Sequence, residues 1–157
     1  MSFLKSLPAE AGLLQIFQAF PEIARPLIEY HEVLLRGESP FTPAQRELIA
    51  AYVSGLNNCN YCRAVHSETA VALGIKPQVM TNTLSNLKSE DVDEIYSAGW
   101  DDRAVHDATA VCGLFNLMNR LVNGLGVEAS ESYTKLAAQR LANGGYAQLL
   151  NFLPATK

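Results

Sequence analysis

Residues 42–66 read TPAQRELIAAYVSGLNNCNYCRAVH and contain the whole of one predicted helix and the first half of the next. Thr42 and Gln45 form a capping box, in which each side chain pairs with a backbone N–H at the helix start. The asparagines at 57–58 accept left-handed backbone geometry and should end this helix, and a second one is expected from Asn60. The stretch therefore predicts two consecutive helices. The core-facing residues expected on the first are Leu48, Ile49, Tyr52, Val53 and Leu56.

The rest of the chain also has helical periodicity. No run alternates between polar and apolar residues with the two-residue period of a strand. An apolar tail after Tyr146 is expected to dock on another part of the molecule. We therefore expect an all-α fold of about seven helices in a single domain over residues 1–157, with the C-x-x-C pair at a helix N-terminus. The further helices are expected over residues 12–20, 22–36, 60–74, 77–87 and 129–141, with another beginning after Ser89. A long helix is expected from Asp101, ending at Gly124 or Gly126.

The cysteine pair carries the clearest chemical signal. Cys62 and His66 lie four residues apart on the predicted helix, so their side chains share one face and lie within reach of each other. An imidazole in that place can accept the proton of a thiol. Cys59 falls at the N-terminal end of the helix, where unpaired N–H groups and the helix dipole favour negative charge. Both sulfurs are therefore expected to form thiolates.

Composition excludes several classes of partner. The chain has a net charge of −4 and no run of basic residues, so nucleic acid is not expected as a partner. No stretch has the pattern of a signal peptide or a membrane span, which predicts no membrane association and, by default, a cytoplasmic location. Hydrophobic residues make up 48% of this small chain, so part of its surface is expected to meet another subunit. The odd number of cysteines does not fit a secretory disulfide framework, so the pair is expected to be redox-active or metal-binding.

One protein family shares the register of these residues. Glu47 is followed by eleven intervening residues, the C-x-x-C pair, three more residues and His66. This pattern resembles the alkylhydroperoxidase AhpD-like family, within the carboxymuconolactone decarboxylase superfamily. The segment FNLMNRLVNGLGVE, residues 115–128, is similar to the later part of peroxidase-related members, so the resemblance covers about residues 40–128. It implies an AhpD-like helical bundle whose subunits assemble as trimers, hexamers or related rings.

The resemblance also implies an activity and residue roles. In the family the cysteine pair reduces peroxides, and by position Cys62 would attack the peroxide while Cys59 closes the disulfide. Glu47 and His66 would relay protons. Tyr61 departs from the pattern, because members often carry another histidine there and a phenol is a poor base near neutral pH. The implied partners are a hydroperoxide substrate and a dithiol or protein reductant, with no bound cofactor and no metal.

Other interpretations of single residues stay open. A zinc site could combine the cysteine pair and His66 with one of Glu47, His31 or Cys112, although structural zinc sites usually supply a second paired motif. Glu47 could instead be a solvated residue in the first turn of its helix. His31 and His106 are expected to be partly exposed helix residues, and Cys112 a small buried hydrophobe. Polar residues on the long helix are expected to make a satisfied buried contact or a subunit interface. These are Asn116, Asn119, Arg120 and Asn123.

Three function classes fit this sequence. The favoured one is a thiol-dependent peroxidase or disulfide reductase that cycles the cysteine pair between dithiol and disulfide. The second is a decarboxylase like the lactone-processing branch of the superfamily, whose members generally lack the pair. The third is a non-catalytic module in which the pair acts as a redox sensor.

Overall fold

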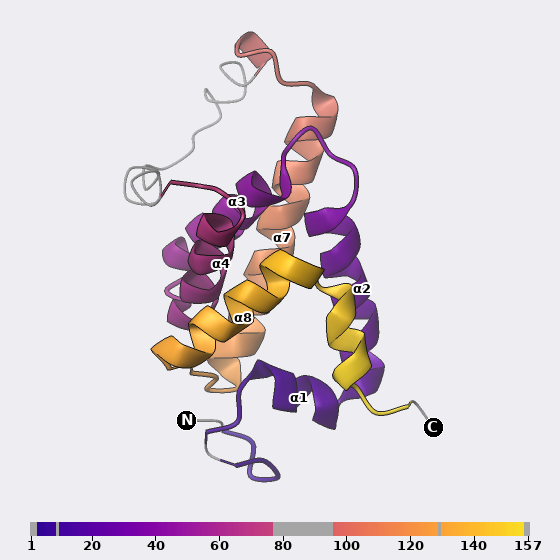
Figure 1. Cartoon of the computed structure of the whole chain (residues 1–157), viewed down its shortest axis with the longest axis vertical. Coiled ribbons are helices and arrows are strands. Elements are labelled where there is room, and N and C mark those ends of the chain that lie inside the picture. The colour runs from indigo at the N-terminus through magenta and orange to yellow at the C-terminus, as the bar shows by residue number, and fades with distance from the viewer. Residues whose placement is uncertain (1–2, 9, 77–95, 129, 156–157) are drawn as a thin grey trace.

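The computed structural model describes residues 3–8, 10–76, 96–128 and 130–155. Every regular element in these ranges is a helix, which confirms the expected all-α class (Figure 1). The predicted segment 77–87 and the helix expected after Ser89 lie outside the described residues. The described elements are α1 (Leu13–Ala19), α2 (Pro21–Arg36), α3 (Pro43–Leu56), α4 (Asn60–Ala72), α7 (Asp102–Gly124), α8 (Glu131–Gly144) and the 3-10 helix η1 (Ala147–Phe152).

Local side chains set the start of α3 and the turn into α4. Thr42 Oγ1 accepts a hydrogen bond from the backbone N–H of Gln45 at 3.3 Å, and Gln45 Oε1 accepts one from the N–H of Thr42 at 2.8 Å. The predicted capping box is therefore present. After α3, Asn58 has a φ of 54°, the left-handed geometry that asparagine tolerates. The chain then enters α4 with Cys59 as its N-cap residue, so the prediction of a C-x-x-C pair at a helix N-terminus is confirmed.

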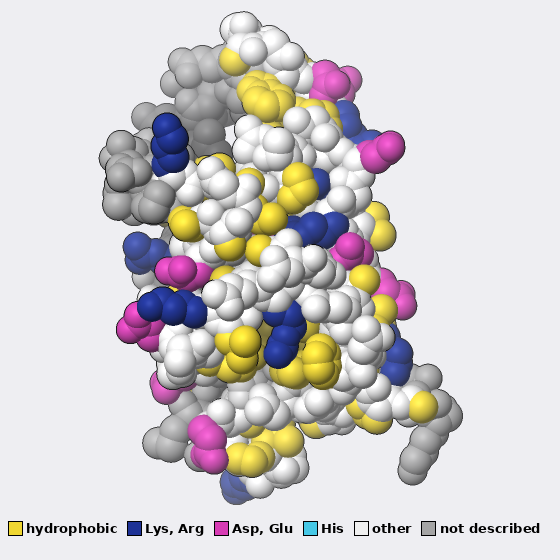
Figure 2. Space-filling view, viewed as in Figure 1, with side chains coloured by type: hydrophobic (Ala, Val, Ile, Leu, Met, Phe, Trp, Pro, Cys, Tyr) yellow, Lys and Arg dark blue, Asp and Glu magenta, His cyan; other side chains and the backbone are white. Residues whose placement is uncertain are grey.

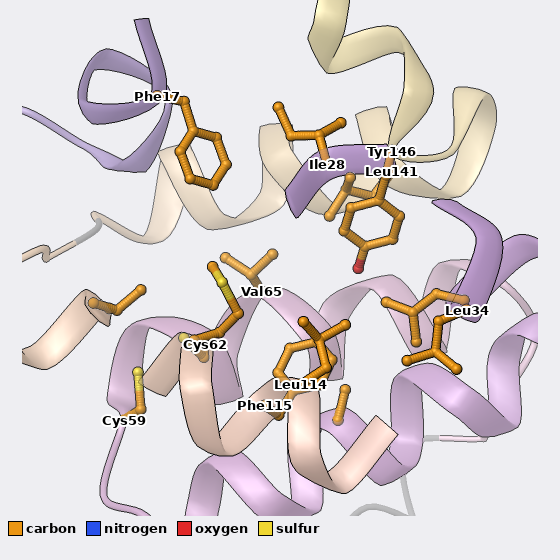
Figure 3. Packing of buried hydrophobic residues seen from close by; sticks show 14 of the residues in the cluster. Phe17, Ile28, Leu34, Cys59, Cys62, Val65, Leu114, Phe115, Leu141 and Tyr146 are labelled. Carbon is orange, nitrogen blue, oxygen red and sulfur yellow. The ribbon is translucent and has the colours of Figure 1, made fainter. Parts of the chain in front are cut away.

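The helices enclose one buried cluster of side chains. Helix α3 packs along α4 and against α7, and α8 lies across α4. The C-terminal η1 packs on α2, and α1 contacts both, so segments from the two ends of the chain lie side by side (Figure 1). Figure 3 shows both cysteines among the buried hydrophobic residues, together with Val65, Phe115 and Tyr146. The candidate site thus lies inside the core and not on its surface.

Two details of the helices differ from expectation. Helix α8 continues to Gly144, past the predicted end near Leu141, and the chain leaves it through Gly145, which has a φ of 64°. The apolar tail that follows forms η1. Leu56 was expected in the core but is 52% exposed, because it is the last residue of α3 and lies where the chain turns toward α4.

Hydrophobic and charged side chains are intermixed on one face of the molecule. Figure 2 shows this mixture on the face that α8 and η1 present to the viewer. On α2, the large hydrophobic residues Ile23, Tyr30 and Val33 are 64%, 47% and 70% exposed. Within the described ranges, no helix combines the length and the apolar character needed to cross a membrane.

Candidate active site

Glu47 is a buried carboxylate, although it lies in the first turns of α3. Its exposed fraction is 0%, so the interpretation of Glu47 as a solvated residue is wrong. Its Oε1 accepts a hydrogen bond from Arg36 Nη2 at 2.7 Å, and its Oε2 lies 2.7 Å from His66 Nδ1. Helices α2 and α4 therefore each supply one basic partner to a residue of α3.

Tyr146, between α8 and η1, completes this group. Its hydroxyl donates to Glu47 Oε1 at 3.0 Å and lies 3.3 Å from His66 Nδ1. Figure 3 shows the hydroxyl pointing into the buried cluster. The guanidinium of Arg36 also lies over the Tyr146 ring, 5.0 Å from its centroid. The sequence indicated only that this tail would dock, because a lone tyrosine among apolar residues carries no chemical pattern.

These contacts fix the charge of Glu47 and the tautomer of His66. Burial alone would raise the pKa of Glu47, but the charge and hydrogen bond of His66, followed by those of Arg36, lower it below its usual value. Glu47 is therefore ionised and acts only as an acceptor, which requires His66 Nδ1 to carry a proton. In the neutral ring, the lone pair is then on Nε2. His66 can accept a further proton there, and the carboxylate stabilises the resulting imidazolium.

The two cysteines are buried free thiols with unequal environments. Cys59 and Cys62 are 0% and 2% exposed. The hydrogen bond from the Cys62 thiol, together with those from the Cys62 backbone N–H and the Asn119 amide, lowers the pKa of Cys59 to about 7, against the effect of burial. The same thiol–thiol bond, with burial, raises the pKa of Cys62. The expectation that both sulfurs favour the thiolate is wrong, because adjacent sulfurs share one negative charge and the N-cap sulfur holds it better.

Asn119 of α7 is the amide that contacts both sulfurs. It is 1% exposed, its Oδ1 accepts from Asn57 Nδ2 at 2.9 Å, and its Nδ2 donates to Ser54 Oγ at 3.0 Å. These two bonds turn its NH₂ group toward the start of α4. Of the polar residues noted on this helix, Asn119 makes the expected buried contact. Asn116, Arg120 and Asn123 are exposed.

A cavity of about 70 Å³ adjoins the reactive groups. Cys62 and His66 both line it, whereas Cys59 does not. This volume suits a few water molecules or one end of a small molecule. Most of its other walls are apolar and come from α1, α2, α7, α8 and the C-terminal tail. They include Leu13, Phe17, Ile28, Phe115, Met118, Leu141 and Leu149.

His31 also lines the cavity, and the expectation that it is partly exposed is wrong. It is 4% exposed and its ring packs against Tyr146, with 5.1 Å between the ring centroids. The neighbours of His31 in the sequence are polar and suggested a surface position. The buried face of α2 was nevertheless readable from the three-and-four spacing of Ala24, Ile28, His31 and Leu35. His106 is exposed as expected, with 74% of its side-chain surface accessible.

Tyr61 lies between the cavity and a larger surface groove of about 810 Å³, since it lines both. Burial, followed by the nearby Tyr133, raises the pKa of Tyr61, so it stays a neutral phenol. The two rings lie with their centroids 6.2 Å apart. The structure thus brings Cys62, His66 and Tyr61 to one cavity, with Glu47 held behind His66 and Cys59 outside the cavity lining.

The zinc interpretation has no geometric support in the described part of the chain. Among those residues, no three His, Cys, Asp or Glu side chains are arranged to hold one metal ion. His66 Nδ1 is occupied by Glu47, and Cys112 lies apart at the edge of the hydrophobic cluster, only partly buried.

Comparison with known proteins agrees with this geometry. The model of the carboxymuconolactone decarboxylase family matches residues 21–86. The resemblance to this superfamily is thereby confirmed over these residues. The match to the carboxymuconolactone decarboxylase family spans α2, α3 and α4, and so contains Arg36, Glu47, both cysteines and His66.

A solved structure shares the fold. It is the crystal structure of an uncharacterized peroxidase-related protein from Silicibacter sp. TM1040, with a TM-score of 0.68 and 23% sequence identity. The similarity covers 78% of this chain and 78% of that one. The helical arrangement described above is therefore common to both proteins. No curated protein matches the sequence.

Proposed function

We propose that this protein is a thiol-dependent peroxidase that reduces hydroperoxides with the Cys59–Cys62 pair. The observation that carries the proposal is that Cys62 and His66 line one cavity while a buried carboxylate fixes the imidazole. The family match and the fold shared with a peroxidase-related protein support it. The pair supplies two electrons, so no bound cofactor is needed.

The first step is deprotonation of Cys62. This thiol is the less acidic of the two, but it is the one that a molecule in the cavity can reach. His66 Nε2 accepts the proton, directly or through one cavity water, and Glu47 stabilises the imidazolium. The Cys62 thiolate attacks the terminal oxygen of the hydroperoxide and the O–O bond breaks. The departing alkoxide takes the proton from His66, which leaves an alcohol and a sulfenic acid on Cys62.

The second step forms the disulfide. Cys59, whose pKa is lowered to about 7, attacks the sulfenic sulfur of Cys62, the S–O bond breaks, and the thiol proton of Cys59 passes to the departing hydroxide, which leaves as water. A dithiol reductant then restores both thiols by exchange. In total, one hydroperoxide and the dithiol give one alcohol, one water and the disulfide.

Peroxide consumption with a dithiol donor tests this proposal. Cys62→Ser is expected to lose turnover, because no nucleophile then faces the cavity. Cys59→Ser is expected to react once and stop at the sulfenic acid, which dimedone labelling detects. Cys112→Ser is the matched control and should keep the activity of the unaltered protein. Turnover at the original rate in Cys62→Ser contradicts the assignment.

The alternative functions give different results in the same assay. A decarboxylase, the activity in the name of the matched family, should retain its function when both cysteines are replaced by alanine. A redox sensor should form the disulfide without multiple turnovers. The cavity that Cys62 shares with His66, and the contact of His66 with Glu47, favour the peroxidase over both.

The expected assembly into a homo-oligomer stays a prediction. Its support is the family match and the exposed hydrophobic side chains on α2. Light scattering is the direct measurement, because a single chain has a mass of 17.1 kDa.

A further inference from the structure

His31 presents an unprotonated ring nitrogen to the cavity. Its Nδ1 lies 2.7 Å from the carbonyl oxygen of Leu27, and because a carbonyl only accepts, Nδ1 carries the hydrogen. Burial lowers the pKa of His31 to about 4, so the ring is neutral near pH 7 and Nε2 holds a lone pair.

This lone pair has no partner in the described part of the protein. The contacts of the ring are the Leu27 carbonyl, Phe115 at 6.0 Å and Tyr146 at 5.1 Å between centroids. In the described core, two fully buried side-chain nitrogens lack a hydrogen bond, Arg25 Nε and Arg46 Nε. His31 Nε2 is not one of them, so this atom is not fully enclosed. Because His31 lines the cavity and Nε2 is neither hydrogen-bonded nor fully enclosed, this nitrogen is available to a molecule in the cavity. A bound molecule with a donor group can satisfy this acceptor.

The two histidines of the cavity have different partners. His66 faces the carboxylate of Glu47, which stabilises its protonated form. His31 has only a neutral carbonyl, and His66 and Glu47 act on its charge in opposite directions. Groups whose environments differ in this way take different chemical roles in one site. His66 is therefore suited to carry a proton, and His31 to accept a hydrogen bond without taking the proton.

We propose that His31 Nε2 accepts the hydrogen bond of the hydroperoxide O–H and so directs the terminal oxygen toward Cys62. This role rests on the proposed peroxidase function. No proton moves to His31, because the hydrogen stays on the oxygen that becomes the sulfenic acid of Cys62. The site then selects molecules with a peroxide O–H over dialkyl peroxides and disulfides, which have no donor to offer.

The variant His31→Phe tests this role. It keeps an aromatic ring against Tyr146 and removes the acceptor. We expect kcat/KM for tert-butyl hydroperoxide to fall about tenfold, the effect of one lost hydrogen bond in the reacting complex. The rate at which a small disulfide such as hydroxyethyl disulfide oxidises the cysteine pair should not change. His31→Gln, which retains an acceptor, should recover part of the loss, and the surface variant His106→Phe should behave as the unaltered protein.

The outcomes separate this inference from the function on which it rests. If the unaltered protein consumes no hydroperoxide, the proposed function fails and the role of His31 fails with it. If His31→Phe keeps the full kcat/KM, or if its peroxide and disulfide rates fall together, only the role of His31 is overturned.

A second measurement does not depend on the folding of His31→Phe. In Cys62→Ser, which cannot turn over, the ¹⁵N resonance of His31 Nε2 should move when tert-butyl hydroperoxide is added, because the lone pair becomes hydrogen-bonded. The resonance should stay in place with di-tert-butyl peroxide. An unchanged resonance with the hydroperoxide overturns the assignment.

Discussion

At the scale of residues, hydrogen-bond donors determine which sulfur carries the charge. Three donors converge on Cys59: the thiol and the backbone N–H of Cys62, and the amide of Asn119. Cys62 instead faces the cavity. The protein thus separates the more acidic thiol from the more accessible one, and places them next to each other so that they can form a disulfide.

The variant Asn119→Leu should raise the pKa of Cys59 above about 7. One lost hydrogen bond to a thiolate corresponds to about one unit. The measurement is the ultraviolet absorbance of the thiolate, or the rate of alkylation by iodoacetamide, as a function of pH. Asn123→Ala is the control, because Asn123 is an exposed residue on the same helix. Identical titration curves for Asn119→Leu and the unaltered protein contradict the role of the amide.

Sequence reasoning could find some of the site residues but not others. Cys59, Cys62 and His66 fall at the start of one helix, where spacing alone brings side chains together, and Glu47 was assigned to them through the register that resembles the family. Their partners come from distant parts of the chain and belong to common residue types without a motif. Whether such a residue is buried depends on which face its helix packs, and this is a property of the tertiary structure. Arg36 and Tyr146 are such partners, whereas the buried contact of Asn119 was expected and the buried face that includes His31 follows from the apolar spacing of α2.

At the scale of elements, the turn between α3 and α4 positions the reactive pair. The capping box fixes the first turn of α3, and the left-handed Asn58 redirects the chain so that Cys59 is the N-cap of α4. Both features were predicted, because capping and left-handed geometry depend on only a few adjacent residues. The end of α8 and the 3-10 form of the tail were not predicted, because contacts with α1 and α2 stabilise the tail.

The variant Asn58→Ala should lower the free energy of unfolding by about 1 kcal/mol, because alanine tolerates left-handed geometry poorly. Asn58→Gly should be close to the unaltered protein, because glycine adopts this geometry freely. Urea denaturation measures both. Asn60→Ala, at the exposed first position of α4, serves as the control. If Asn58→Ala and Asn58→Gly were equally stable, the turn would not depend on this backbone conformation.

At the scale of the whole molecule, burial of His31 makes stability depend on pH. The unfolded chain binds a proton at His31 below about pH 6.5, whereas the folded chain binds it only near pH 4. Stability that is fully present above pH 6.5 is therefore lost as the pH falls toward 4. The lowered pKa of Glu47 also stabilises the folded chain. This stabilisation is lost only as the pH falls below the ordinary pKa of a carboxylate toward the lowered one.

When the pH is lowered from about 7.5 to about 5, protonation of His31 in the unfolded chain should lower the free energy of unfolding by about 2 kcal/mol. His31→Phe should remove this loss, since the other titrating groups are common to both proteins. Urea denaturation of the two proteins at both pH values gives the comparison. Equal losses in the two proteins would show that another group causes the acid sensitivity.

The carboxylate of Glu47 joins segments that are made at very different times. Arg36 reaches it from α2, and Tyr146 reaches it from a point 99 residues further along the chain than Glu47. A chain emerging from the ribosome contains both cysteines and His66 long before it contains Tyr146 or the last wall of the cavity. Loss of the segment from Tyr146 onward is therefore expected to remove one hydrogen bond to Glu47 and part of the cavity wall, while Arg36 and His66 keep their contacts with that carboxylate.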